Sequence, residues 1–208
     1  MAAKWITQSP AQSVNYVESH DNLALADKIT ASVKGVTPAG IAQLSHFATS
    51  VAFLSQGVPF MQAGQEFLRS KNGDENSYKS SDEVNSLKWS TKSKYVATTK
   101  YFQGLIALRK AHPAFRMSTT AQLKANLKFI PTTNDLIAYT LNGAAVKDSA
   151  KTILVIHNPN LGTSTLTLPT KSKWSVLVKG VIAGNKPIET LNTKTISIQG
   201  QSTMVLTQ

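Results

Sequence analysis

Four consecutive polar residues, Ser19, His20, Asp21 and Asn22, form the stretch of this sequence best suited to chemistry. An imidazole next to a carboxylate can hydrogen-bond a ligand or exchange a proton. The preceding residues, 14–17, are apolar, β-branched or aromatic at most positions, which favours a buried strand of a parallel sheet. Polar side chains inside such a sheet would be costly, so the strand is expected to end at a pocket. The simpler alternative is that Asp21 or Asn22 caps the helix that follows.

A second polar pair follows a second apolar run. Residues 58–63 lie between Gly57 and Gly64 and predict another buried strand, and Gln65 and Glu66 come directly after it. If the two strands are parallel neighbours, Glu66 lies on the same rim as Asp21. The alternative for Glu66 is a buried salt bridge to Arg69 or to another basic residue.

The segment 70–90 is polar, lacks periodicity and is longer than most connections in compact domains, which indicates either a binding loop or disorder. Within it Asn76 offers an amide, Tyr78 an aromatic ring and Asp82 a carboxylate. These groups suit the hydroxyls and the flat face of a sugar.

The elements that must position these residues change in type along the chain. Helices are predicted at 23–33, at 37–54 with Thr37 as its N-cap, and at 95–112, so the first part reads as strand, helix and strand. From Phe115 onward, alternating and β-branched runs predict seven strands of an antiparallel β-sandwich, at 127–131, 136–141, 152–157, 163–168, 174–178, 195–198 and 203–206. The expected fold class is therefore α/β in residues 1–113 followed by all-β in residues 114–208.

The composition narrows the possible functions. An apolar content of 41% is ordinary for a globular protein, and the absence of cysteine excludes disulfides and thiolate metal sites. The net charge of +11 comes from scattered lysines, which favours a solvated basic surface over a nucleic-acid module. No signal sequence, membrane span, nucleotide motif or zinc spacing is evident, so no cofactor or metal is expected.

Several stretches, in order, carry a resemblance to one family. Residues 16–22, Tyr-Val-Glu-Ser-His-Asp-Asn, resemble the seventh-strand motif of the α-amylase superfamily (glycoside hydrolase family 13). Residues 57–69 resemble its eighth strand, residues 71–85 resemble a loop of type I pullulanase, and residues 101–113 resemble the helix that closes the barrel. The resemblance covers the first half of the chain closely and the second half, which is similar to the C-terminal β domain, more loosely.

The resemblance implies a fold and a set of roles. The chain is expected to be the last quarter of a (β/α)8 barrel followed by the β-sandwich. By resemblance Asp21 stabilises the transition state and His20 hydrogen-bonds the same sugar, while Asn22, Glu66, Asn76 and Tyr78 bind substrate. The nucleophile and the proton donor belong to earlier strands, which this sequence does not contain.

The implied function is that of the C-terminal part of an enzyme that hydrolyses α-1,6 branch linkages in pullulan, starch or glycogen. The isolated chain is expected to be inactive, and its partners would be α-glucan and the missing N-terminal portion of the enzyme. The parent enzyme is expected to be secreted or displayed on a bacterial surface. The alternative is a non-catalytic module that binds α-glucan or cell wall.

Overall fold

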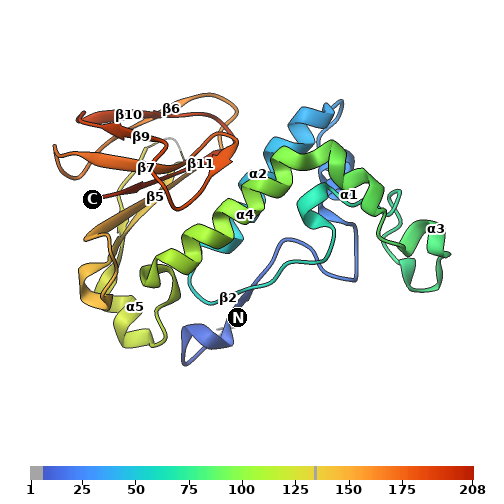
Figure 1. Cartoon of the computed structure of the whole chain (residues 1–208), viewed down its shortest axis with the longest axis horizontal. Helices are drawn as coiled ribbons and strands as arrows, with labels where there is room; N and C mark the ends of the chain where they lie inside the picture. Colours follow the sequence, from blue (N-terminus) through green and yellow to red (C-terminus); the bar gives the residue numbers. More distant parts are fainter. Residues whose placement is uncertain (1–6, 134) are drawn as a thin grey trace, which may run out of the picture.

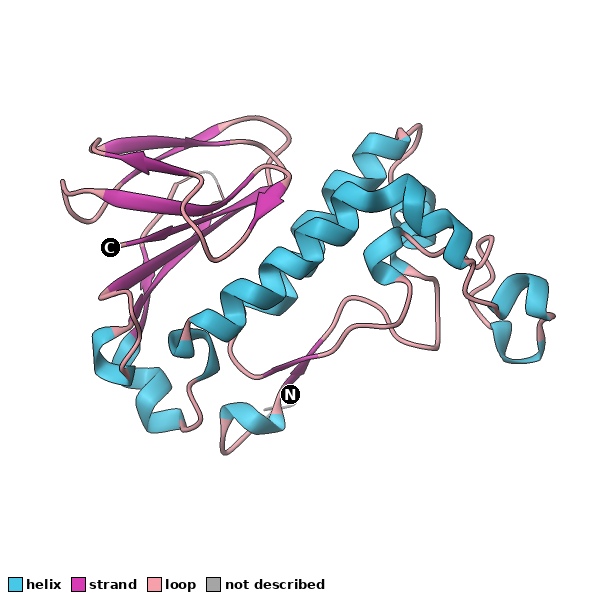
Figure 2. Ribbon diagram, viewed as in Figure 1, coloured by secondary structure: helices cyan, strands magenta, loops and turns pink. Residues whose placement is uncertain are grey.

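The computed structural model describes residues 7–133 and 135–208. A pair of long helices, α2 (Pro38–Leu54) and α4 (Val96–Ala111), lies against one face of a large antiparallel sheet, and a smaller sheet covers the other face (Figures 1 and 2). The N-terminal strands and the polar loops lie on the far side of the helices from the sheet (Figure 1). Within the described residues, no helix is long and apolar enough to cross a membrane.

The first part of the chain forms a strand, two helices and a strand, as predicted. Strand β1 (Val14–Asn15) pairs in parallel with β2 (Val58–Pro59), and α1 (Leu25–Ser32) and α2 connect them. The predicted start of α2 is confirmed, because Thr37 Oγ1 accepts a hydrogen bond from the amide of Gly40 at 3.1 Å. A short 3-10 helix, η1 (Pro10–Gln12), precedes β1.

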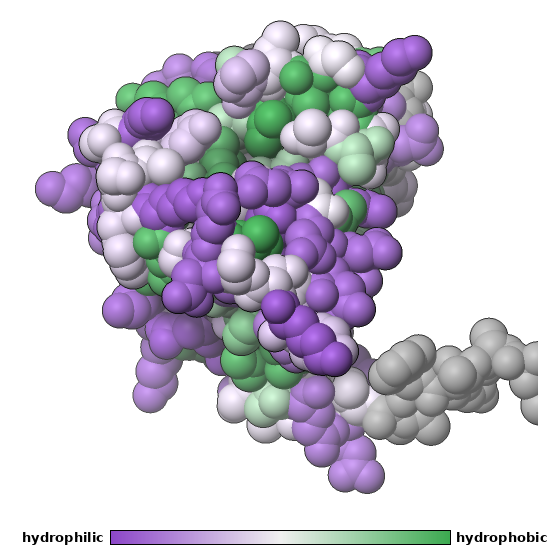
Figure 3. Space-filling model, turned by 90° about the vertical axis from the view of Figure 1, so that its right-hand side faces the viewer, coloured by the Kyte–Doolittle hydropathy of each residue, from purple (hydrophilic) through white to green (hydrophobic). Residues whose placement is uncertain are grey.

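The prediction that both of these strands are buried was wrong. Each has only two residues in strand conformation, and the side chains of Val14, Tyr16 and Phe60 are 55%, 56% and 44% exposed. The cause is that, among the described residues, β1 and β2 pair with each other and with no further strand. Figure 3 shows apolar patches among hydrophilic residues on the side of the molecule that lies to the right in Figure 1.

The segment between β2 and the large sheet is helical. Residues 70–90, predicted without regular structure, contain short helices. The elements are η2 (Gln65–Phe67), η3 (Ser77–Lys79), α3 (Asp82–Asn85), η4 (Trp89–Tyr95), α4, η5 (Pro113–Arg116) and α5 (Thr120–Asn126). The helix predicted at 95–112 is confirmed as α4, whereas α5 was not predicted. Helix α4 approaches the sheet at Gly104, where an added Cβ would lie 1.9 Å from the carbonyl oxygen of Ala183.

The large sheet has the strand order β3-β4-β5-β11-β7-β8, and β9 also pairs with β7. All of its pairings are antiparallel, and β10 and β6 form a separate antiparallel pair. The strands are β3 (Leu127–Ile130), β4 (Ile137–Asn142), β5 (Thr152–Asn158), β6 (Ser164–Thr167), β7 (Trp174–Lys179), β8 (Ile182–Ala183), β9 (Glu189–Leu191), β10 (Thr195–Ile198) and β11 (Ser202–Thr207), with η6 (Ala144–Val146) between β4 and β5. Seven of these strands were predicted to within about a residue, and β8 and β9 were not.

The central strands are buried on both faces. In β5, Ile153 and Val155 belong to the core shared with α2 and α4, while Leu154 and Ile156 belong to the core shared with β6 and β10. This explains the continuous apolar run in β5, because a strand covered on both sides has no solvent-facing positions. Trp174 is fully buried in the second core.

Candidate functional site

The predicted polar segment lies at the end of β1 and faces solvent. His20 Nε2 and Asp21 Oδ2 are 3.5 Å apart, and their side chains are 86% and 74% exposed. Asn22 has a positive φ of 62°, so the backbone turns sharply directly after Asp21. Exposure leaves the imidazole and carboxylate free to contact a ligand.

The alternative role for Asp21 and Asn22, capping the next helix, is excluded by the geometry. Helix α1 begins after Ala24 without a side-chain cap from that residue. The carboxylate of Glu18 instead accepts a very short hydrogen bond from the amide of Leu25, the first residue of α1. Glu18, for which no role was predicted, therefore accepts a hydrogen bond at the start of α1 in place of Asp21 or Asn22.

A cavity of about 350 Å³ lies beside Asp21. This volume is at the lower end of the range of about 300–1,000 Å³ typical of small-molecule sites. Its lining combines carboxylates, an amide, a lysine and an aromatic ring: Tyr16, Val17, Glu18, Ser19, Asp21, Asn22, Leu23, Lys28 and Glu75. Of the predicted site residues, Asp21 and Asn22 line this cavity, whereas His20, Glu66, Asn76 and Tyr78 do not.

A buried lysine holds the strand end in place. Lys71 is only 3% exposed, and its Nζ donates a hydrogen bond to the carbonyl oxygen of His20 at 2.9 Å. Asp27, on α1, accepts from the amide of Lys71 at 2.7 Å and from the hydroxyl of Ser70 at 2.5 Å. The loop after β2, helix α1 and the His20–Asp21 peptide are therefore fixed to one another. Nothing in the local sequence pattern distinguishes Lys71 from a surface lysine.

Glu18 has an unusual electrostatic environment directly behind the rim. It is 5% exposed, and burial raises its pKa to about 7, although the Leu25 amide and the nearby charge of Arg69 oppose the rise. Its second carboxylate oxygen has no hydrogen-bond partner among the described residues. A buried carboxyl group with a pKa near neutrality is often found at functional sites. A glutamate directly after the strand predicted at 14–17 was the signal that could have identified it.

The loop expected to bind sugar is ordered by its own polar groups. Asp74 accepts from the amide of Asn76 at 2.9 Å and from the hydroxyl of Ser80 at 2.5 Å, and these hydrogen bonds, that of Ser80 foremost, lower its pKa. The side chain of Tyr78 is 74% exposed, and Asn76 is exposed as well. Neither side chain lines the cavity beside Asp21. Glu75 is the residue of this loop that does.

Glu66 does not form the predicted salt bridge to Arg69. One of its carboxylate oxygens accepts a hydrogen bond from the amide of Gly64 at 3.0 Å, while Arg69 donates to the carbonyl oxygen of Asn85 at 2.5 Å. Glu66 follows β2 as Asp21 follows β1, but it is not among the residues that line the cavity. Over residues 7–133 and 135–208, no group of three His, Asp or Glu side chains is placed to hold a metal ion.

Comparison with known proteins gives the family. Residues 123–181 match the family described as "Pullulanase, all-beta domain". The pullulanase of Bacillus subtilis (strain 168) is 36% identical over 201 residues, which are 97% of this chain and 28% of that protein. The pullulanase structure from Bacillus acidopullulyticus matches with a TM-score of 0.92 and 40% identity over 97% of this chain and 25% of its own. The chain belongs to the pullulanase family.

The predicted resemblance to type I pullulanase is thus confirmed, and with it membership of a group of debranching glycosidases in the α-amylase superfamily. A pullulanase type I structure from Bacillus subtilis, solved with maltose, matches with a TM-score of 0.89 at 36% identity and covers 96% of this chain. The chain spans only about a quarter of the length of these pullulanases. The mixed α/β fold with antiparallel sheets agrees with the corresponding part of these pullulanases.

Proposed function

We propose that this chain provides the part of a pullulanase-type enzyme that grips the sugar at an α-1,6 branch linkage of pullulan, starch or glycogen. The observation that carries the proposal is the exposed His20–Asp21 pair beside a cavity of about 350 Å³, anchored from behind by Lys71. The maltose in the Bacillus subtilis pullulanase structure supports an α-glucan as the ligand.

In the proposed mechanism Asp21 accepts hydrogen bonds from hydroxyls of the sugar being cleaved, and His20 donates one to the same sugar. These contacts contribute to catalysis to the extent that they strengthen as the ring distorts toward the oxocarbenium-like transition state. Asn22 contacts the same sugar, while Glu66, Asn76 and Tyr78 bind neighbouring units of the glucan. Bond cleavage needs a nucleophile and a proton donor, which the resemblance assigns to other strands, so the chain alone is expected not to hydrolyse pullulan.

The same proposal accounts for the exposed strands. Residues 1–113 would form the last two strand units of a (β/α)8 barrel, and residues 114–208 a β-sandwich domain. The exposed side chains of Val14, Tyr16, Val58 and Phe60 would then contact the remaining strands of the barrel in a complete enzyme. The parent enzyme would act outside the cell or on its surface.

A titration with maltotetraose followed by two-dimensional NMR tests the proposal. We expect the backbone amides of Asp21 and Asn22 to shift on titration, and Asp21→Asn to abolish the shifts. Asp135→Asn, which changes an exposed carboxylate in the β3–β4 turn, serves as the matched control and should leave them unchanged. Shifts confined to residues 114–208 would contradict the proposal.

An assay on pullulan separates this role from a complete active site. We expect no release of reducing sugar above the level of an Asp21→Ala variant. Release that depends on Asp21 would show that the chain contains its own catalytic groups. A non-catalytic glucan-binding role is the second candidate, and it is favoured if maltotetraose binds but the Asp21→Asn variant binds equally well.

A further inference from the structure

One end of the large sheet gathers lysines that are far apart in the sequence. The strand register places the end of β4, the start of β5, the end of β11 and the start of β7 together, because Asn142 pairs with Thr152 and Thr207 pairs with both Ile153 and Ser175. The connections at this end contain five exposed lysines: Lys147, Lys151, Lys171, Lys173 and Lys194.

Hydrogen bonds confirm that these connections lie close together. The amide of Lys151 donates to the carbonyl oxygen of Gln208 at 2.7 Å, and the hydroxyl of Thr170 donates to the side chain of Gln208 at 3.2 Å. The amide of Leu168 donates to the carbonyl oxygen of Lys194 at 2.8 Å. We call this set of five residues the lysine end of the sheet.

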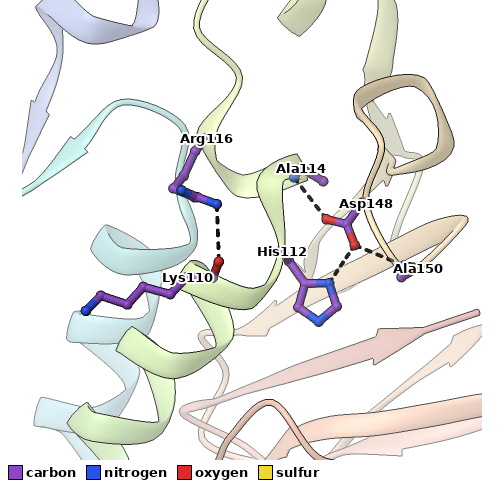
Figure 4. A network of polar contacts seen from close by, with 6 residues as sticks. All are labelled: Lys110, His112, Ala114, Arg116, Asp148 and Ala150. Atoms are coloured by element: carbon purple, nitrogen blue, oxygen red, sulfur yellow. Dashed lines mark hydrogen bonds and ion pairs between the residues drawn. The ribbon is translucent and has the colours of Figure 1, made fainter.

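The acidic residue nearest to the lysine end in the sequence is hydrogen-bonded to groups other than these lysines. Asp148 has a fully buried side chain, and its Oδ1 lies 2.7 Å from Nδ1 of His112 (Figure 4). The amides of Ala114 and Ala150 also donate to Asp148, at 3.0 and 2.9 Å. Burial by itself would raise the pKa of Asp148, but these hydrogen bonds outweigh it and lower the pKa, so the group stays ionised and satisfied internally.

The other two acidic residues after His112 are either paired with a different lysine or located at the opposite end of the sheet. Glu189 pairs with Lys179 at 2.7 Å. Asp135 lies in the β3–β4 turn, which the register places at the opposite end of β4 from Lys147. Within the described residues, none of these three acidic side chains forms an ion pair with a lysine of the lysine end.

The surface between the lysines is hollowed. A cavity of about 470 Å³ is bordered by Lys173, Ser149, Asn185 and Gln208, and one of about 290 Å³, bordered by Arg116 and Lys147, lies on the other side of the Asp148 turn. Polar groups and cations thus border both hollows. Lysines act as hydrated point charges rather than planar forks, so they suit repeated contact with phosphates more than recognition of one fixed group.

We propose that the lysine end binds a flexible, phosphate-bearing polymer that has no bases. Nucleic-acid recognition is disfavoured because single strands need aromatic side chains for stacking. Phe129, on β3, is the exposed aromatic side chain of residues 114–208 as far as the structure describes them, and a single ring cannot stack a series of bases. In Figure 1 the end of β11 lies on the far side of the molecule from α3 and its loop, so a polymer held there leaves the Asp21 cavity open.

Binding of fluorescently labelled inorganic polyphosphate to the 208-residue chain tests this proposal. Five phosphate contacts give a slope of log affinity against log salt of about −3.5, so affinity should fall about 100-fold between about 50 and about 200 mM salt. Substituting all five lysines by glutamine should remove most of this binding and flatten the slope.

The matched control replaces five exposed lysines elsewhere, namely Lys34, Lys88, Lys92, Lys94 and Lys100, by glutamine. Both variants lower the net charge equally, so the control should retain polyphosphate binding and its slope. Equal loss in the two variants would show that net charge alone is responsible and would overturn the proposal. Tighter binding of an oligothymidylate of equal charge would also overturn it, in favour of nucleic acid.

Discussion

Replacing Glu18 by glutamine should change the pH dependence of stability. Burial raises the pKa of Glu18 from 4.5 to about 7 in the folded chain. Below pH 4.5 the group is protonated in both states and folding carries no penalty. Between pH 4.5 and about 7 the unfolded chain is ionised while the folded group stays protonated, so stability falls over this range and levels off above it. At about 1.4 kcal/mol per pH unit, the loss approaches about 3 kcal/mol at pH 8.

Urea unfolding of both proteins between about pH 4 and about pH 8 measures this loss. The glutamine cannot ionise but keeps an acceptor for the Leu25 amide, so Glu18→Gln should gain up to about 3 kcal/mol relative to the parent chain as the pH rises. Subtracting the two curves removes the contributions of buried His46 and His157, whose lowered pKa values of about 4 act between pH 4 and 6.5. Glu75→Gln, which removes an exposed carboxylate from the same cavity, serves as the matched control. Parallel curves for Glu18→Gln and the parent would refute the reasoning.

Three further substitutions test other contacts. Lys71→Met removes a charge-assisted hydrogen bond worth about 1.5–3 kcal/mol, so hydrogen-exchange protection of the rim should fall, while Lys71→Arg should restore part of it. Gly104→Ala should destabilise the chain by at least about 1–3 kcal/mol, because α4 must move off the sheet, whereas Gly162→Ala, with open space around it, should be close to neutral in thermal unfolding. Asp148→Ala leaves buried His112 without its partner and should cost about 3–5 kcal/mol in urea unfolding, and a loss below 1 kcal/mol would contradict this.

The sequence by itself determined the order and type of most elements. Thr37 and Pro38 specified the start of α2, and the period-two runs specified seven strands, because capping and side-chain alternation are local properties. The Tyr16–Asn22 motif and the stretches 57–69, 71–85 and 101–113, taken in order, also identified the family. The short strands β8 and β9 escaped prediction, since two or three residues carry no periodicity. Helix α5 escaped because none of its seven residues is buried, so it has no apolar face to detect.

The tertiary structure alone decided which residues meet. Val14 and Tyr16 have the composition of a buried strand, yet they are exposed, because burial depends on a neighbouring strand and not on the residue itself. Lys71 and His20 are 51 positions apart, and the charge of a lysine gives no sign that it will be buried against a carbonyl group. The same holds for the lysine end, whose members come together only through strand register. Contacts between residues far apart in the sequence, which no local pattern encodes, thus hold the candidate site in place through Lys71 and bring the five lysines to one end of the sheet.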